Sequence, residues 1–382
     1  MRRVPTIALQ PGMRVGHPIY NSNGETLLNK NVIIKKKYID SLLKLGIPAI
    51  YIMDESLPDY YVDDVIDERT RIQTIQLTKK ILCNPDIAKS PLNKALLMEA
   101  QMNIINIIDQ LLENPNLMVN MVDIRSFDDY LFNHSVNVCV LSLITGISLG
   151  YNKPVLINLG MGALMHDIGK TLIPAQLLNK PGQLTADEFN VIKLHSEYGH
   201  TILSNNEPYI NKISALIALQ HHERFNGDGY PQGLKGEKKS QLHVFSQIAG
   251  IADVYDAMTA DRVYRKAQPP NEAYEMLAGS GDYLFDYELV LAFLSNIAAY
   301  PAGSLVRLSS NEVAMVTETT KGLSLYPKIK IIFDANGNRL MNPLDIDMSE
   351  NSTLTIISVL DHIEIEELKI TEQRQIDPNY GT

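Results

Sequence analysis

The stretch Ala163-Leu-Met-His-Asp-Ile-Gly-Lys170 places an imidazole, a carboxylate and an amine close together in an apolar run that we expect to be helical. Neighbouring helix positions lie about 100° apart, so the side chains of His166 and Asp167 can reach one cluster. Burying these polar groups among Leu, Met and Ile costs free energy unless a positive charge satisfies them. A divalent metal ion supplies such a charge, and the rest of the chain offers further ligands for it.

The further candidate ligands follow in an ordered series, each in or at the end of a segment with helical spacing of apolar residues. They are His134, His195, His221, His222 and Asp253. A lone histidine on an apolar helix is more often a core residue with a hydrogen bond. Together with His166 and Asp167, however, the series exceeds the roughly four ligands of one zinc ion and suits two ions that share a bridging carboxylate. Mixed imidazole and carboxylate ligation favours iron, manganese or zinc over magnesium or calcium.

A glycine-rich loop directly follows the histidine pair. It reads Glu223-Arg-Phe-Asn-Gly-Asp-Gly-Tyr-Pro231, and its candidate pocket residues are Gly229, Tyr230 and Pro231. Glycine and proline favour irregular backbone, and loops on a rigid helical frame often carry substrate contacts. A plain connector can have the same composition.

Cationic side chains near the candidate ligands can bind a phosphate. Arg262 and Arg265 share a helix face at i,i+3, where two guanidinium groups can hold phosphate oxygens, although an isolated pair is more often a solvated helix end. Lys170 can polarise a phosphate oxygen or a hydroxide, or lie exposed at a helix end. Two metals about 3.5–4 Å apart activate a bridging water and clamp a phosphodiester. These residues therefore predict phosphodiester hydrolysis by metal-activated water, and we see no nucleophilic serine or cysteine and no Walker loop.

Composition and charge indicate a globular protein of a reducing, cytoplasmic compartment. The 382 residues carry a net charge of −10, which argues against binding a DNA or RNA polymer or an anionic membrane. Cys83 and Cys139 are the only cysteines, so we expect no disulfide framework. We find no signal peptide and no apolar run that approaches the roughly 18 residues of a membrane span, and we expect no membrane insertion.

The pattern along the chain predicts a mainly α fold in which a helical domain is flanked by small β-rich parts. The predicted segments are a β-rich N-terminal domain of unknown role at 1–93, a helical domain at 94–298, a β-rich subdomain at 299–360 and a polar tail at 361–382. Strands are expected at Arg14–Tyr20, Ala49–Met53, 304–308, 313–316, 328–333 and 352–359. Helices are expected within Val32–Leu45 and at 94–112, and the second is apolar enough to serve a homodimer.

The motifs in this order resemble a known family. The series His134, His166-Asp167-Ile-Gly-Lys170, His195, His221-His222-Glu223, Gly229-Tyr230-Pro231 and Asp253-Val-Tyr-Asp256 is similar to the HD-GYP domain, a subgroup of the HD superfamily of metal-dependent phosphohydrolases. The resemblance covers roughly residues 100–295. The strand-rich piece after Tyr300 is similar to the tail that usually follows these domains, and residues 1–60 resemble a β-rich region of some bacterial members.

The resemblance implies a phosphodiesterase that hydrolyses the bacterial second messenger cyclic di-GMP to linear pGpG, with further cleavage to GMP left open. It implies metal ligands at His134, His166, Asp167, His195, His221, His222 and Asp253. It also implies Asp167 as the bridging ligand and Lys170 as the catalytic lysine. The implied substrate contacts are Arg262, Arg265, Gly229, Tyr230 and Pro231, and Asp256 matches an acidic position near the metals.

The chain departs from the family pattern at one position. Family members with three metals carry a glutamate one helical turn before the first histidine, where this chain has Tyr130. We therefore expect two divalent ions, iron or manganese, while the nearby Asp128 and Asp129 leave a third ion as the alternative. The alternatives are a mixed-base cyclic dinucleotide as substrate, or a non-catalytic protein that senses a cyclic dinucleotide or acts as a scaffold for a signalling partner.

Overall fold

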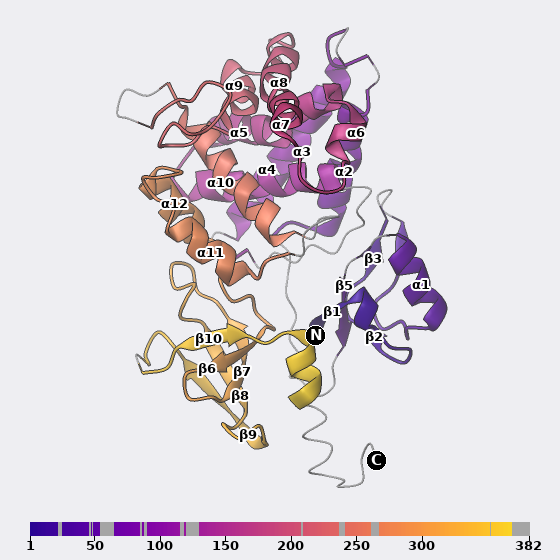
Figure 1. The fold of residues 1–382 in the computed structure, drawn as a ribbon, viewed down its shortest axis with the longest axis vertical. Helices are drawn as coiled ribbons and strands as arrows, with labels where there is room; N and C mark the ends of the chain where they lie inside the picture. Colours follow the sequence, from indigo (N-terminus) through magenta and orange to yellow (C-terminus); the bar gives the residue numbers. More distant parts are fainter. Residues whose placement is uncertain are drawn as a thin grey trace.

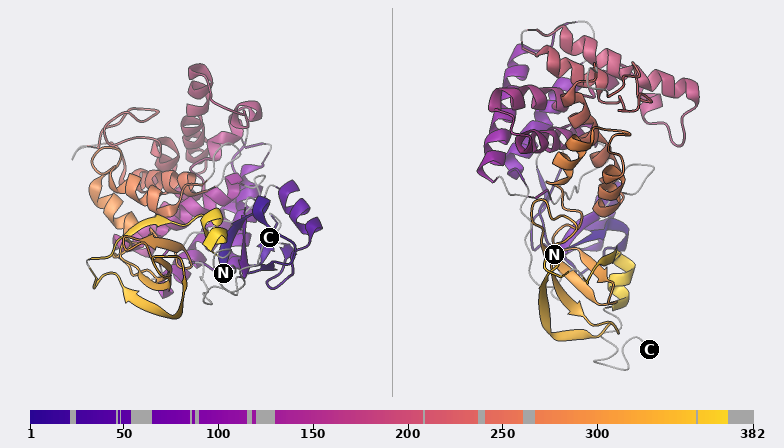
Figure 2. Two further views of the ribbon diagram at one scale, coloured as in Figure 1. Left: turned by 60° about the horizontal axis from the view of Figure 1, so that its bottom comes forward. Right: turned by 90° about the vertical axis from the view of Figure 1, so that its left-hand side faces the viewer.

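The computed structural model describes most of the chain, in three parts (Figure 1). The described residues are 1–368 without 22–24, 46, 48, 54–64, 85, 88–89, 115–117, 120–129, 208, 237–240, 261–266 and 352. A helical domain lies above two β-rich lobes in the right-hand view of Figure 2, one lobe formed by the N-terminal residues and the other by the C-terminal residues. The predicted fold class, mainly α with two small β-rich parts, is confirmed.

The N-terminal lobe is a small sheet covered by one helix. Its elements are β1 (Arg2–Pro5), η1 (Thr6–Ala8), β2 (Arg14–Val15), β3 (Ile19–Tyr20), β4 (Thr26–Leu28), α1 (Lys36–Lys44) and β5 (Ala49–Met53). The strands pair antiparallel in the order β1-β5-β2, and β3 and β4 form a separate hairpin. Ile39 and Leu42 share one face of α1 and are buried with Ile50 of β5, so the lobe has a core of its own.

The helical domain is built around α4. Its elements are α2 (Glu68–Leu82), α3 (Lys94–Glu113), α4 (Tyr130–Ser148), α5 (Lys153–Leu164), η3 (Ile168–Leu172), α6 (Ala175–Leu178), α7 (Ala186–Lys193), α8 (His195–Ser204), α9 (Lys212–Gln220), α10 (Val244–Thr259), α11 (Pro270–Ala278) and α12 (Tyr287–Leu294). Helix α4 packs against α2, α5, α10 and α12. A helix that is surrounded on so many sides must be apolar around its circumference, and Val136, Val140 and Leu143 are all buried.

The expectation that the chain lacks an apolar run of membrane-spanning length was wrong. The window Leu131–Ser148 of α4 is 18 residues long, with a mean hydropathy of 1.4, and 83% of it is buried inside the fold. Neighbouring helices therefore cover this apolar surface. On α3, the apolar stripe of Leu97, Ile104 and Ile108 is likewise buried within the chain, whereas Met98 and Met102 are exposed, and a homodimer through this helix stays a prediction.

Helix α2 belongs by its packing to the helical domain. Ile75, Leu77 and Ile81 lie in the same apolar core as α3 and α4, and that core begins at Val65. We therefore propose that the domain boundary lies before α2 rather than at residue 93.

The C-terminal lobe is a five-stranded antiparallel sheet. Its strands are β6 (Leu305–Leu308), β7 (Val313–Glu318), β8 (Lys328–Phe333), β9 (Arg339–Asp347) and β10 (Ile356–Val359), in the order β10-β6-β7-β8-β9. The sequence analysis missed β9, because this edge strand is mostly exposed, contains Pro343 and shows no alternation of apolar residues. Residues 362–368, which were expected to begin a polar tail, are helical, and Ile365 is buried in the core of this lobe.

Candidate metal centre

All seven predicted metal ligands lie together in the helical domain. Their positions are His134 on α4, His166 and Asp167 between α5 and η3, His195 at the start of α8, His221 and His222 after α9, and Asp253 on α10. His166, His195 and His221 are fully buried, and Asp167 is 1% exposed. The packing of α4, α5, α8, α9 and α10 thus creates a buried cluster from residues that are far apart in the sequence.

His166 and Asp167 lie in a turn and not in a helix, contrary to the sequence prediction. Helix α5 ends at Leu164, and η3 begins at Ile168. The turn is fixed by close packing of η3 on α8, because a Cβ atom on Gly169 would lie 1.9 Å from the backbone oxygen of His195. Only glycine allows this approach, which brings Asp167 opposite His195.

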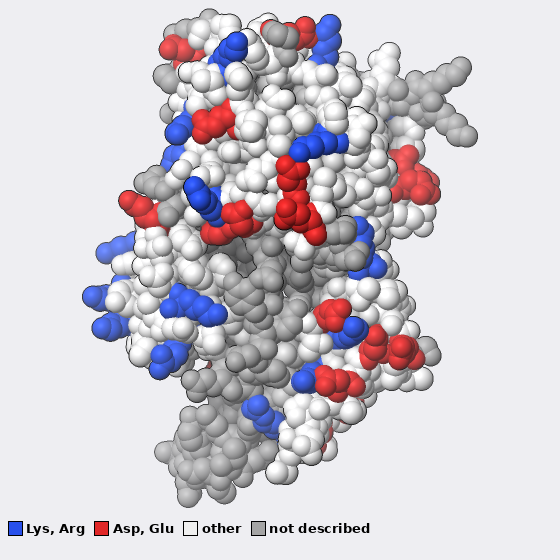
Figure 3. All heavy atoms as spheres, turned by 180° about the vertical axis from the view of Figure 1, so that it is seen from behind, with Lys and Arg blue, Asp and Glu red and all other residues white. Residues whose placement is uncertain are grey.

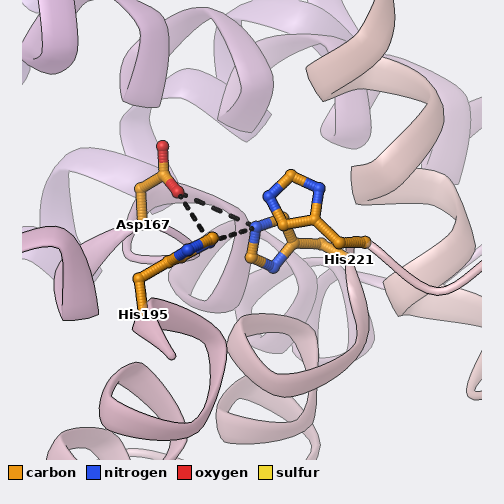
Figure 4. Close-up of side chains that lie close together, drawn as sticks. Asp167, His195 and His221 are labelled. Atoms are coloured by element: carbon orange, nitrogen blue, oxygen red, sulfur yellow. Dashed lines mark hydrogen bonds and ion pairs between the residues drawn. The ribbon is translucent and has the colours of Figure 1, made fainter. Parts of the chain in front are cut away.

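The carboxylate of Asp167 faces two groups of histidines, one with each oxygen. Its Oδ1 lies 3.5 Å from Nε2 of His195 and 3.7 Å from Nε2 of His221 (Figure 4). Its Oδ2 lies 3.3 Å from Nε2 of His166 and 3.7 Å from Nε2 of His134. Asp167 therefore belongs to two sets of donor atoms, each compact enough to hold a metal ion. The first set also contains His195, His221 and His222, and the second contains His134 and His166.

Each of three histidine rings makes a hydrogen bond on the side away from the cluster. This bond determines which ring nitrogen carries the proton and which directs a lone pair at the cluster. Nδ1 of His166 contacts the carbonyl of Ala163 at 2.8 Å, and Nδ1 of His195 contacts that of Ile192 at 2.6 Å. Nδ1 of His221 lies 3.0 Å from the carbonyl of Ile217. A carbonyl can only accept, so each Nδ1 carries the proton, and a neutral ring then presents an Nε2 lone pair to the cluster.

This arrangement places acceptors opposite acceptors. Nε2 of His195 lies 3.4 Å from Nε2 of His221, and both face a carboxylate oxygen. Among the described residues, the buried Nε2 of His166 and Oδ1 of Asp167 have no hydrogen-bond partner. Lone pairs at these distances repel unless a cation lies between them, so the donor set fits divalent metal ions.

Burial and neighbouring charges set the protonation states needed for metal binding. Burial holds the pKa of His221 and His222 well below the usual histidine range and also lowers that of His195, so these rings are neutral. Burial alone would raise the pKa of Asp167, but the neighbouring charge of Lys170 outweighs it and holds that pKa well below its usual range. Nζ of Lys170 lies 2.5 Å from Oδ2 of Asp167.

Asp253 lies on the other side of the cluster, between His134 and His222. Its Oδ1 lies 3.1 Å from Nε2 of His134, and its Oδ2 lies 3.8 Å from Nδ1 of His222. Burial would raise the pKa of Asp253, but the hydrogen bond and charge of His134 hold it well below its usual range. A second carboxylate that remains charged is therefore available to the cluster.

A chain of buried polar residues supports His134 from behind. Nδ1 of His134 lies 2.6 Å from Oδ2 of Asp256, whose Oδ1 accepts a hydrogen bond from Asn137 at 2.8 Å. Oδ1 of Asn137 accepts a hydrogen bond from Arg71 at 2.9 Å. Burial alone would lower the pKa of His134, but hydrogen bonds to Asp253 and Asp256 raise it to about 9. Asn137 and Arg71 were not predicted as site residues, although Asn137 lies at i+3 from His134 and thus on the same helix face.

The predicted loop lies against the cluster and is fixed by Glu223, a residue of the sequence motif to which no role was assigned. The Glu223 carboxylate accepts hydrogen bonds from the backbone of Gln232 at 2.7 Å and of Leu234 at 2.8 Å. A Cβ atom on Gly229 would lie 2.3 Å from the backbone nitrogen of Arg224, so this approach also requires glycine. The loop places the ring of Tyr230 on that of His222, with centroids 4.7 Å apart and planes 30° apart.

Other predicted positions lie outside the residues that the structure describes. Arg262 and Arg265 belong to the segment 261–266, which follows α10, and the side chain of Tyr130 is likewise not described. Their roles in phosphate binding and metal number stay predictions.

Comparison with known proteins agrees with the motif resemblance. Residues 116–289 match the sequence model of the HD domain, and residues 305–368 match a KOW domain associated with the HD domain. A cyclic di-GMP phosphodiesterase of Pseudomonas aeruginosa is 36% identical over 227 residues, which are 59% of this chain and 53% of that protein. The cyclic di-GMP phosphodiesterase response regulator RpfG of Xanthomonas campestris is 40% identical over 146 residues, 38% of each chain.

A third relative carries a different substrate in its name. A 3′3′-cGAMP-specific phosphodiesterase of Vibrio cholerae is 34% identical over 157 residues, which are 41% of this chain and 33% of that protein. The chain thus spans about half or less of the length of the curated relatives that it matches.

Proposed function

We propose that this protein is a metal-dependent phosphodiesterase that hydrolyses cyclic di-GMP to linear pGpG, because residues 116–289 match the sequence model of the HD domain. The relatives named as cyclic di-GMP phosphodiesterases support the substrate class. The observation that carries the proposal is the position of Asp167, whose two oxygens face separate histidine groups with lone pairs directed at them. This geometry matches the bridging ligand of a two-metal centre.

We propose two divalent ions, iron or manganese, because imidazole and carboxylate donors are mixed in the cluster. One is assigned to His195, His221, His222 and Asp167, and the other to His134, His166 and Asp167, with Asp253 beside both. When bound, such ions supply an acidified water and positive charge for the oxygens of a phosphodiester.

The protein groups around the cluster serve to orient the substrate. Lys170 is the partly exposed cation of the cluster, with a side chain 26% exposed, and its ammonium can bind a diester oxygen while it contacts Asp167. Tyr230 stacks on His222 and so covers one face of that imidazole ring. Arg262 and Arg265 are proposed as further phosphate contacts, since they follow α10, which carries Asp253.

The test is hydrolysis of cyclic di-GMP by protein purified without oxygen and loaded with manganese or iron, with products separated by chromatography. Linear pGpG is expected from the native chain, and an Asp167→Ala variant is expected to be inactive. His200→Ala is a matched control, because His200 lies on α8 like His195 but outside the metal cluster. A folded, metal-loaded protein that yields no product would refute the enzyme proposal.

Two alternatives are separated by the same assay. Competition between cyclic di-GMP and 3′3′-cGAMP tests the substrate suggested by the Vibrio relative. Nucleotide binding and cellular signalling that both survive Asp167→Ala would favour a non-catalytic sensor or scaffold. Accumulation of GMP rather than pGpG would show that the second bond is also cleaved.

Surface charge and thiols support a cytoplasmic location and a small anionic ligand, which we propose for this chain. On the face shown in Figure 3, lysine and arginine are interspersed with aspartate and glutamate in the upper part and at the lower right, whereas basic residues gather without acidic ones at the lower left. The net charge of −10 disfavours a nucleic-acid polymer as the ligand. Cys83 and Cys139 are both free thiols, as expected in a reducing compartment.

A further inference from the structure

An aromatic and cationic patch lies beside the metal centre. It consists of Phe189 and Lys193 of α7 together with Tyr230. Phe189 is 42% exposed, although it is a large apolar side chain. Its ring centroid lies 6.0 Å from that of Tyr230, with the planes 82° apart. Nζ of Lys193 lies 4.8 Å from the ring centroid of Phe189 and 5.6 Å from that of Tyr230, so the cation is shared by both rings.

The patch is continuous with the metal cluster. Tyr230 stacks on His222 and lies 6.3 Å from the ring of His195. The aromatic rings of His222, Tyr230 and Phe189 therefore form a row that leads from the metal ligands to the surface. Helix α7, which carries Phe189, lies beside α8, which carries His195 (Figure 1).

Phe189 is held on an ordered helix and not on a free loop tip. Thr185 and Glu188 form a reciprocal capping box at the start of α7. The carboxylate of Glu188 also contacts Nζ of Lys180 at 2.6 Å. The exposed ring is thus presented in a defined position, as a recognition surface requires.

We propose that Phe189 and Lys193 form a subsite for a purine base of the substrate, next to the metal centre that takes the phosphodiester. This inference rests on the proposed function and extends it to substrate recognition. An exposed aromatic face offers a stacking surface to any base, and Lys193 supplies a donor for a base carbonyl or a neighbouring phosphate oxygen. Stacking on a ring contributes enough binding free energy that its loss weakens binding by about tenfold.

The chain contains a matched control pair. Nζ of Lys94 lies 4.9 Å from the ring centroid of Tyr209, which is 41% exposed. Tyr209 follows the C-terminal end of α8, whereas His195 is at the start of that helix. At a rise of about 1.5 Å per residue, this pair is roughly 15 Å away along the helix axis. Lys94 and Tyr209 thus also combine a cation with an exposed ring, but they lie far from the candidate metal centre.

The test compares GMP with ribose 5-phosphate, which share a sugar and a phosphate and differ in the base. Dissociation constants are measured by calorimetry on the full-length, manganese-loaded chain, so that no turnover is needed. Phe189→Ala is expected to weaken GMP binding by about tenfold and to leave ribose 5-phosphate binding unchanged. Phe189→Trp should restore GMP binding, and Tyr209→Ala should change neither constant.

Equal weakening of both ligands by Phe189→Ala, or no change for GMP, would overturn the subsite. In a turnover assay the same variant should raise KM for cyclic di-GMP more than it lowers kcat, because the ring acts on binding and not on the reacting atoms. If the native chain does not hydrolyse cyclic di-GMP, the proposed function fails, whereas the difference between GMP and ribose 5-phosphate still tests the subsite.

Discussion

Nδ1 of His134 lies 2.6 Å from Oδ2 of Asp256, although 122 positions separate the two residues in the sequence. The contact joins α4 to α10 and orients His134, whose Nε2 faces Asp167 and Asp253. A carboxylate behind a metal-binding imidazole fixes the ring and increases its basicity. Asp256 thus orients His134 within the candidate metal centre.

We expect Asp256→Asn to weaken metal binding by about 10- to 100-fold, because the hydrogen-bond acceptor is kept while its charge is lost. Manganese affinity measured by competition with a chelator checks this prediction. Asp40→Asn is the control, since Asp40 is an exposed residue of α1 that forms a surface ion pair with Lys36. An unchanged affinity in Asp256→Asn would show that Asp256 only supports packing between the helices.

Replacement of Asp167 should affect both metal positions, because each of its oxygens faces a different histidine group. We expect Asp167→Ala to reduce the metal content of the purified protein from two ions per chain to nearly none. His166→Ala should mainly reduce the metal occupancy of the position formed by His134, His166 and Asp167. Elemental analysis of anaerobically purified proteins gives both numbers. A content of two ions in Asp167→Ala would contradict a bridging role.

The clustering of the seven histidine and aspartate side chains could be predicted from the sequence, because imidazole and carboxylate groups stand out in apolar helical segments. Their role as metal ligands stays a prediction. The helix over Lys94–Glu113 could be predicted for a similar reason, since its apolar spacing is regular. The turn at His166 and Asp167 could not, because it depends on contact between Gly169 and the backbone of His195. The local backbone conformation is here set by a contact between segments that are distant in the sequence.

Supporting residues were harder to predict than ligands. Arg71 and Asn137 act through a hydrogen-bonded chain that exists only when α2, α4 and α10 are packed. In the sequence, Phe189 is an ordinary apolar position of a helix. Its proposed role in base binding rests on the neighbouring Tyr230 and Lys193, which only the fold brings next to it. The edge strand β9 lacks the alternation that marks a half-buried strand, so local pattern could not reveal it.

The loop that carries Tyr230 should not tolerate a side chain at Gly229. A Cβ atom there would lie 2.4 Å from Cα of Glu223, so Gly229→Ala must displace the backbone and with it Tyr230. We expect kcat/KM for cyclic di-GMP to fall by about 100-fold, as small misplacements near a reacting centre commonly do. Gly279→Ala is the control, because its Cβ would meet atoms no closer than 3.6 Å. Equal activity of the two variants would show that the loop is not part of the site.

The start of α2 should make the stability of the protein depend on pH in the acid range. Asp67 caps the helix by accepting a hydrogen bond from the backbone of Thr70 at 2.8 Å, and its side chain also contacts Gln110 of α3. Burial would raise the pKa of Asp67, but hydrogen bonds from Thr70 and Gln110 outweigh it and lower that pKa below 3.8. The charged carboxylate therefore stabilises the fold above about pH 4, and this contribution is lost as the pH falls through the lower folded-state pKa.

We expect Asp67→Ala to reduce the free energy of unfolding by about 1 kcal/mol at pH 7, as loss of a helix N-cap usually does. The difference between native chain and variant should shrink as the pH falls from about 3.8, where the unfolded carboxylate becomes protonated, through the lower pKa of the native carboxylate. Asp67→Asn keeps a capping oxygen without the charge, so its effect at pH 7 should be smaller. Urea unfolding at pH 7, 5 and 3 measures these differences. A difference between native chain and Asp67→Ala that grows towards pH 3 would contradict a depressed pKa, because the charged form would then not be the stabilising one.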